Sequence, residues 1–227
     1  MLALVRLPLA RITRTPRGWL PIVTWSAVAL LAALLMRKTG QSSGADHVLR
    51  GIFGVVVLPL LTYGVVSATL GAGNVWSAIR SLVALGAKPG RAVLASVVVA
   101  MVAAAVVCGI VAAAVCVLAH GEADPPLAWD VPASFGVAFM GGAAYAAYFC
   151  AGSAIGRGAM RGGFLAIDYI VGASSGFGAL FTPRGHVMSL LGGPACFELS
   201  PRTSSMIIVL VSVAYISLAI RLGGRAR

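Results

Sequence analysis

Charged residues are scarce in this sequence, and acidic residues are the scarcest. Only 10% of the 227 residues are charged, with six Asp and Glu against 17 Lys and Arg, while 59% are apolar. Soluble domains carry about 25% charged residues, so this chain has too little polar side chain to cover a soluble globule. The composition excludes a soluble enzyme, a disordered chain and a disulfide-stapled secreted module.

The sequence also lacks the residue patterns that bind metals and nucleotides. The four cysteines have no metal-ligand spacing and are typical of small buried hydrophobic residues. The three histidines fall in expected loops, with no ligand partner nearby in the sequence. There is no Gly-x-x-x-x-Gly-Lys-Ser/Thr phosphate loop. We therefore expect no metal, no cofactor and no nucleotide-binding domain in this chain.

Long uncharged apolar runs are what the sequence has in abundance. A helix crosses a bilayer with about 20 apolar residues, and runs without apolar–polar alternation form helices rather than barrel strands. The first run is too long for the core of a signal peptide, so we interpret it as a retained anchor. We predict an all-α integral membrane protein, one transmembrane domain over residues 1–227, with spans near 18–36, 51–70, 92–119, 133–156, 162–181 and 203–220.

The distribution of cations predicts the orientation of these six spans. Twelve of the 17 cations fall in segments 1–17, 71–91, 157–161 and 221–227, which contain no acid. The other segments between spans hold five cations and five of the six acids. Because positive loops stay in the cytoplasm, both termini are predicted to be cytoplasmic. The expected location is the bacterial cytoplasmic (inner) membrane, as a multi-pass protein.

The basic N-terminal stretch, residues 1–17, mixes apolar residues with four arginines and two prolines. Two readings stay open. Either the stretch lies on the inner leaflet with its cations on lipid phosphates, or it is only a basic flank that sets the topology.

A short amphipathic helix is predicted between the second and third spans. Asn74 is a suitable N-cap, and Gly86 and Pro89 are helix-stopping residues. The polar face holds Asn74, Ser77, Ser81 and Lys88, whereas Val75, Ile79, Leu82 and Val83 form an apolar stripe, and Trp76 and Arg80 suit an interface. This cytoplasmic helix either anchors a loop or is a lever that contacts a partner.

The last outer loop, residues 182–202, is only partly polar. Its apolar stretch from Val187 to Leu191 is followed by Gly192, Gly193 and Pro194. We predict a short re-entrant helix before the sixth span, which must pack on protein to satisfy its ends. It either caps an outer gate or fills a gap between helix ends.

Asp168 is the only acid within a predicted span, where an unpaired carboxylate costs several kcal/mol. It is expected either to form a structural ion pair with Arg157 or Arg161, or to line a cavity. The hydroxyls of four tyrosines need partners, namely those of Tyr145, Tyr148, Tyr169 and Tyr215. These tyrosines either line a path with Asp168 or join helices.

Two pairs of glycines are spaced for close helix packing. Gly152 and Gly156, and Gly172 and Gly176, are small-xxx-small pairs that let backbones approach. The second pair also matches Gly-x-Ser-x-Gly, but a nucleophile elbow needs a strand–turn–helix setting. An intramembrane enzyme is therefore the weakest interpretation.

The order of these parts resembles the permease subunit of an ABC-2 type transporter. The segment from Trp76 to Arg91 is similar to the family's coupling segment, which ends in a proline and a basic residue. The Tyr-Ala-Ala-Tyr-Phe run from Tyr145, the pair Arg157 and Arg161, and Leu-Ser-Pro from Leu199 resemble later parts of the family. One departure is that the segment has no acid, and Arg80-Ser-Leu stands where the family often has Gly-Thr-Leu.

This resemblance implies a permease that moves a substrate with ATP hydrolysed elsewhere. The chain would form a homodimer, or a pseudo-dimer with a second permease, in membrane lipid and without nucleic acid. A separate ATP-binding cassette ATPase subunit would bind ATP and Mg and contact the coupling helix. The implied contact residues are Trp76, Ile79, Arg80, Leu82, Val83 and Lys88.

The chain would then not be an enzyme by itself. The alternative is a non-transporting membrane scaffold or partner-recruiting protein. Five of the six predicted spans lack ionisable acids or bases, which favours this alternative.

Overall fold

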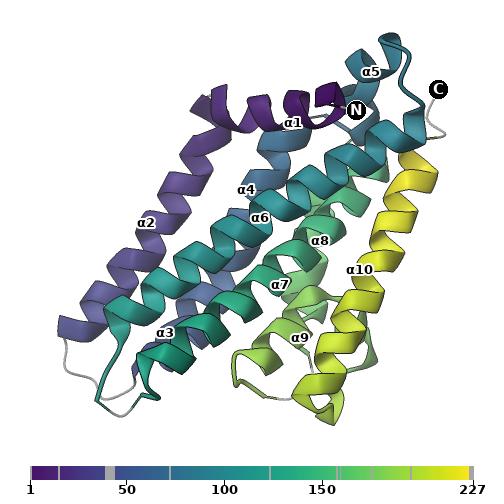
Figure 1. Cartoon of the computed structure of the whole chain (residues 1–227). Helices are drawn as coiled ribbons and strands as arrows, with labels where there is room; N and C mark the ends of the chain where they lie inside the picture. Colours follow the sequence, from purple (N-terminus) through teal and green to yellow (C-terminus); the bar gives the residue numbers. More distant parts are fainter. Residues whose placement is uncertain are drawn as a thin grey trace.

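A computed structural model describes residues 2–14, 16–38, 44–71, 73–122, 124–156, 158, 160–174, 176–194 and 196–224. Helices make up nearly all of this part of the chain, and no strand occurs in it. The long helices lie side by side in a slanted bundle (Figure 1). The prediction of an all-α chain is confirmed.

Five helical segments are long and apolar enough to cross a membrane. The second of them starts with the short helix α3 (Gly44–Val48) and includes the π-helix η1 (Leu49–Val57), which continues into α4 (Leu58–Leu70). The other four are α2 (Pro16–Lys38), α6 (Pro89–Ala119), α7 (Leu127–Ala154) and α10 (Pro201–Gly223). These five correspond to the first, second, third, fourth and sixth predicted spans.

The fifth predicted span is not one continuous helix, so this prediction is wrong. Helix α8 (Met160–Val171) has 12 residues, which is about 18 Å at 1.5 Å per residue and shorter than a bilayer core. The chain then turns at residues 172–174, and the 3₁₀ helix η2 (Phe177–Phe181) follows. The turn holds Gly172 and Ser174, whose Oγ donates to the Val171 carbonyl at 2.6 Å. Glycine and a backbone-bonding serine both weaken a helix.

A short helix does precede α10, as predicted. Helix α9 (Pro183–Leu190) begins four residues before the apolar run, because Pro183 occupies its first turn. Pro183, Arg184 and His186 are buried within it. It lies at the end of the bundle where α10 begins (Figure 1), and the short 3₁₀ helix η3 (Cys196–Glu198) follows it in the sequence.

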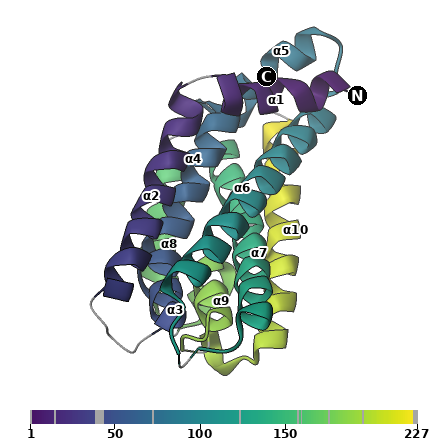
Figure 2. The same cartoon turned by 60° about the vertical axis from the view of Figure 1, so that its left-hand side comes forward.

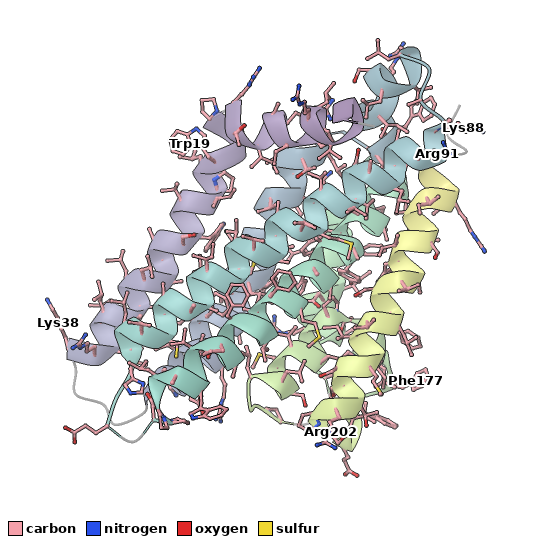
Figure 3. The ribbon with its side chains drawn as sticks, in the orientation of Figure 1. Trp19, Lys38, Lys88, Arg91, Phe177 and Arg202 are labelled. Atoms are coloured by element: carbon pink, nitrogen blue, oxygen red, sulfur yellow. The ribbon has the colours of Figure 1, made fainter. Side chains whose placement is uncertain are left out.

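The basic segments lie together at one end of the bundle. Helix α1 (Leu2–Arg14) lies across this end, near α5 (Val75–Ala84) and the end of α10 (Figures 1 and 2). Figure 3 places Lys88 and Arg91 here, whereas Lys38 and Arg202 lie at the opposite end. The fold thus separates the two groups of segments that the charge distribution distinguished.

Small residues allow close contact between the central helices α6 and α7. A Cβ atom on Gly142 would lie 2.8 Å from the Ala104 carbonyl oxygen, and one on Gly109 would lie 2.7 Å from the Phe135 ring. Large apolar side chains instead cover the outside of the bundle, where Met206 is 70% exposed and Leu35 is 62% exposed. This distribution suits a bundle surrounded by lipid.

Candidate coupling helix and buried polar cluster

Helix α5 has well-defined stops at both ends. The Asn74 Oδ1 atom accepts a hydrogen bond from the Ser77 backbone N–H at 2.8 Å, which caps the first turn. At the other end Gly86 has φ +87°, and its N–H donates to the Val83 carbonyl at 2.9 Å. This left-handed glycine ends the helix. The caps predicted at Asn74 and Gly86 are both present.

One face of α5 packs on the bundle, and the other is exposed. Val75, Ile79 and Leu82 are at most 2% exposed, and Trp76 and Val83 are partly buried against the same core. These five side chains therefore hold α5 in place. Of the implied contact residues, Ile79 and Leu82 are not accessible to a partner.

The exposed face of α5 is small and basic. It includes Arg80 and Ser81, and it continues into the turn where Leu85 is 77% exposed. Lys88 is also exposed, but it stands at the N-cap position of α6 rather than in α5. A partner at this end of the bundle meets Arg80, Leu85 and Lys88.

Arg161 of α8 forms hydrogen bonds to α7, to α4 and to the segment that precedes α5. Its Nε donates to Ser153 Oγ of α7 at 2.7 Å, and its Nη1 donates to Ser67 Oγ of α4 at 2.8 Å. Longer bonds run from the guanidinium to the carbonyls of Gly71 and Gly73, at 3.2 and 3.3 Å. Because Gly73 directly precedes the N-cap of α5, this buried side chain of α8 fixes where α5 begins.

The turn between α7 and α8 contacts the same place through backbone atoms. Gly158 has φ +91°, and a Cβ there would lie 2.8 Å from Gly73 and 3.0 Å from the Asn74 nitrogen. A glycine is therefore required by both conformation and space. The beginning of α5 is held by Arg161 and Gly158 together.

The predicted pairing of Asp168 with Arg161 is wrong, since the Arg161 guanidinium is bound by serines and carbonyls. Arg157, the other predicted partner, lies outside the described residues. Asp168 is fully buried, and its Oδ2 accepts from the Tyr145 hydroxyl at 2.9 Å. Its Oδ1 accepts from the Arg184 backbone N–H at 3.2 Å. The carboxylate thus joins α8 to α7 and α9.

Arg184 supplies the cation nearest to this carboxylate. Its guanidinium lies 4.5 Å from the centre of the Tyr169 ring, which is a cation–π distance. Its Nη1 also donates to the Val55 carbonyl of η1 at 3.2 Å. The sequence did not predict this role for Arg184, because this residue falls among the cations of an expected outer loop.

The remaining tyrosines join helices. The Tyr148 hydroxyl donates to the Phe164 carbonyl at 2.9 Å, so it connects α7 to α8. Tyr215 of α10 donates to the Phe181 carbonyl at 2.7 Å, and its ring centre lies 5.1 Å from that of Tyr148. The sequence left two roles for these tyrosines, lining a path or joining helices. The observed hydrogen bonds join helices.

The four predicted packing glycines occupy two kinds of place. A Cβ on Gly152 would lie 2.9 Å from Phe164, and one on Gly172 would lie 2.7 Å from Thr182 Oγ1, so both are at close contacts. Gly156 has φ +68° and lies in a turn, and Gly176 precedes η2. The second member of each pair therefore shapes a turn instead of a helix–helix contact.

Comparison of the chain with models of protein families, with curated proteins and with solved structures finds no match. Two features of the structure carry functional information. One is the capped helix α5, exposed at the basic end and tied to α8. The other is the Asp168 cluster, which joins α7, α8 and α9 inside the bundle.

Proposed function

We propose that this chain is the membrane subunit of an ATP-driven transporter of the ABC-2 type. It would lie in the bacterial inner membrane as a homodimer or a pseudo-dimer with a second permease. A separate ATPase subunit would bind ATP and Mg and supply the energy. The observation that carries the proposal is the attachment of α5 to α8 by Arg161, at the end of the bundle rich in cations.

The mechanical argument starts from how α5 is held. Its apolar face packs on the bundle, and Gly73, which directly precedes its N-cap, accepts a hydrogen bond from Arg161 of α8. A displacement of α5 by a partner would therefore move α8. Asp168 lies seven residues further along α8, about 10 Å at 1.5 Å per residue, and bonds to Tyr145 and Arg184.

A transporter needs two arrangements of its helices, with the partner biasing one of them. The break between α8 and η2 is where such a change would be absorbed, because residues 172–174 and 176 are not helical. The Asp168 cluster would change its partners as α8 moves. This chain would supply the path, and the ATPase closure would supply the free energy.

The proposal is tested by ATP hydrolysis that purifies with the chain. The tagged chain is extracted from its own host in mild detergent, and vanadate-sensitive ATPase activity is measured. Arg80→Glu with Leu85→Asp changes only exposed residues, so the bundle stays intact, and the activity should fall to background. The matched control is Arg202→Glu at the opposite end, which should leave it unchanged. Absence of ATPase activity, or activity unaffected by the double substitution, contradicts the proposal.

The alternative is a membrane scaffold that transports nothing. The burial of Asp168 with two hydrogen-bond donors favours it, because a carboxylate satisfied in this way needs no substrate. A scaffold would purify without ATPase activity and as a monomer by light scattering. The same preparation therefore discriminates between the two functions.

A further inference from the structure

A groove of about 840 Å³ runs along the outer side of α6 next to α1. Its walls are apolar, formed by Val5 and Leu9 of α1 and by the α6 side chains that include Leu94 and Val98. Among the described residues that line it, Arg91 is the only charged one. The groove therefore combines a long apolar wall with one cation at the end of α6 that lies beside α1 (Figure 3).

The apolar wall has the length of one lipid leaflet. Exposed side chains recur on α6 every four residues, at Leu94, Val98, Val102 and Val106, with exposures of 39–55%. From Leu94 to Val106 the helix rises about 18 Å. Half of the hydrocarbon core of a bilayer is about 15 Å, so the wall matches a single acyl chain.

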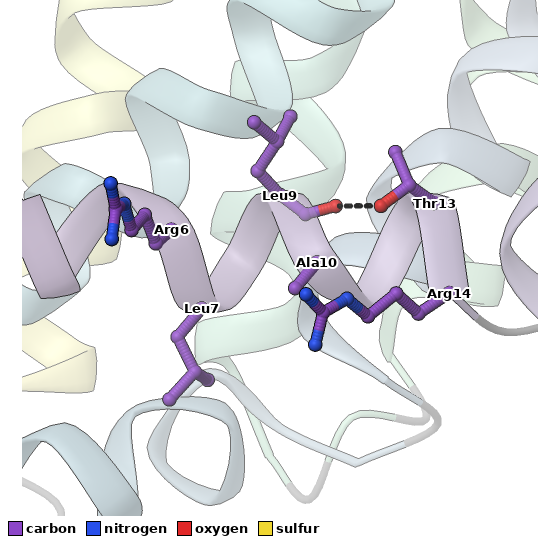
Figure 4. Close-up of a pocket in the computed structure, with 6 residues that line it drawn as sticks. All are labelled: Arg6, Leu7, Leu9, Ala10, Thr13 and Arg14. Carbon is purple, nitrogen blue, oxygen red and sulfur yellow. Dashed lines mark hydrogen bonds between the residues drawn. The ribbon is translucent and has the colours of Figure 1, made fainter.

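A second cavity, of about 610 Å³, adjoins the groove and adds positive charge. It is lined by Arg6, Thr13 and Arg14 of α1, and it shares Leu9 with the groove. Figure 4 shows the Arg6 and Arg14 side chains extending from α1 on either side of Ala10. These two arginines make the surface beside the groove basic, whereas Arg91 is the cation that lines the groove itself.

We propose that this groove binds one anionic phospholipid, with its phosphate at Arg91 and an acyl chain along α6 from residue 94 to 106. The inference rests on the membrane placement proposed above. A second copy of this chain is a poorer occupant. In a twofold contact Arg6, Arg14 and Arg91 would face the same three cations, which repel each other.

The test is titration of the delipidated full chain in detergent, followed by mass spectrometry of the intact complexes. Phosphatidylglycerol is compared with phosphatidylcholine of the same acyl chains. One cation near a headgroup contributes about 1 kcal/mol, or about fivefold in affinity. We expect phosphatidylglycerol to bind about fivefold more tightly, and Arg91→Gln to remove this preference. Val98→Trp, which fills the groove from an exposed position, should weaken both lipids.

Two matched controls lie elsewhere on the surface. Arg202→Gln removes an exposed cation at the opposite end, and Leu210→Trp enlarges a side chain of α10 that is 67% exposed. Neither should change lipid affinity. Equal affinity for the two lipids, or a preference that survives Arg91→Gln, overturns the proposal. A dimer that Val98→Trp dissociates also overturns it, in favour of a second copy. None of these readings needs ATP or transport, so the transporter proposal stands or fails separately.

Discussion

At the scale of single residues, Arg161 is a buried side chain that connects several helices of the bundle. It is 3% exposed and bonds to two serines and two backbone carbonyls. A buried cation is costly unless its donors are satisfied. The neutral oxygens around Arg161 provide that satisfaction, so the residue joins helices without an acidic partner.

Removal of this cation is therefore expected to destabilise the bundle. Hydrogen bonds to a charged group contribute about 1.5–3 kcal/mol each, and part is offset by relief of the buried charge. We expect Arg161→Met to lower the free energy of unfolding by about 3 kcal/mol in detergent, measured by denaturant titration. Arg202→Met, at an exposed position, serves as the control. A variant as stable as the unsubstituted chain would show that the bonds around Arg161 are dispensable.

Asp168 offers a test between a structural and a functional carboxylate. Asn at this position keeps Oδ1 to accept from the Arg184 N–H, and its Nδ2 can donate to the Tyr145 hydroxyl oxygen. Asp168→Asn should therefore change stability by less than about 1 kcal/mol. Asp168→Leu leaves the buried Tyr145 hydroxyl without an acceptor and should cost about 1–3 kcal/mol. If the charge serves transport, Asp168→Asn abolishes transport in proteoliposomes while the fold is retained. Full transport by Asp168→Asn would assign the residue a structural role alone.

At the scale of elements, α5 is short and depends on its caps and its buried face. A helix of ten residues is marginal on its own. Asn74 caps it, Gly86 ends it, and Ile79 and Leu82 fix it to the bundle. Its exposed residues can consequently change without loss of the fold.

Loss of the N-cap should loosen α5 while the bundle stays folded. Replacement of an N-cap by alanine costs about 1 kcal/mol, so Asn74→Ala should speed amide hydrogen exchange of residues 75–84 by about fivefold. Ser81→Ala, which removes an exposed hydroxyl in the same helix, should leave exchange unchanged. Equal exchange in both variants would mean that packing alone holds α5.

At the scale of the whole molecule, five helices and the caps of α5 followed from elementary patterns. Apolar runs of about 20 residues predict long helices, and the Asn74 and Gly86 signals are local. The break in the fifth predicted span could not be predicted from composition, because glycine and serine, as at Gly172 and Ser174, also occur within membrane spans. A side chain at Gly172 would meet Thr182 and Arg184, and sequence spacing does not reveal this close approach.

The hydrogen-bond partners of the buried charged residues could not be predicted from the sequence for the same reason. Arg161 and Asp168 lie about two turns apart on one helix, and this spacing predicted an ion pair between them. In the fold Arg161 faces Ser67 and the turn before α5, which are about 90 residues away in the chain. Such contacts depend on how helices cross, and periodicity within one helix carries no information about that.

The central claim is that the end of the bundle with α1 and α5 faces the cytoplasm and the other end faces outward. Thiol labelling tests it most directly. The four native cysteines are buried, and burial raises the pKa of the Cys196 thiol, so background labelling is low. Single cysteines replace the exposed residues Lys88, Arg221, Lys38 and Arg202.

A membrane-impermeant maleimide is applied to intact cells and then to lysed cells. We predict that Lys38→Cys and Arg202→Cys react in intact cells, whereas Lys88→Cys and Arg221→Cys react only after lysis. Reaction of Lys88→Cys in intact cells, or accessibility of Lys88→Cys and Arg221→Cys from opposite sides, would contradict the account.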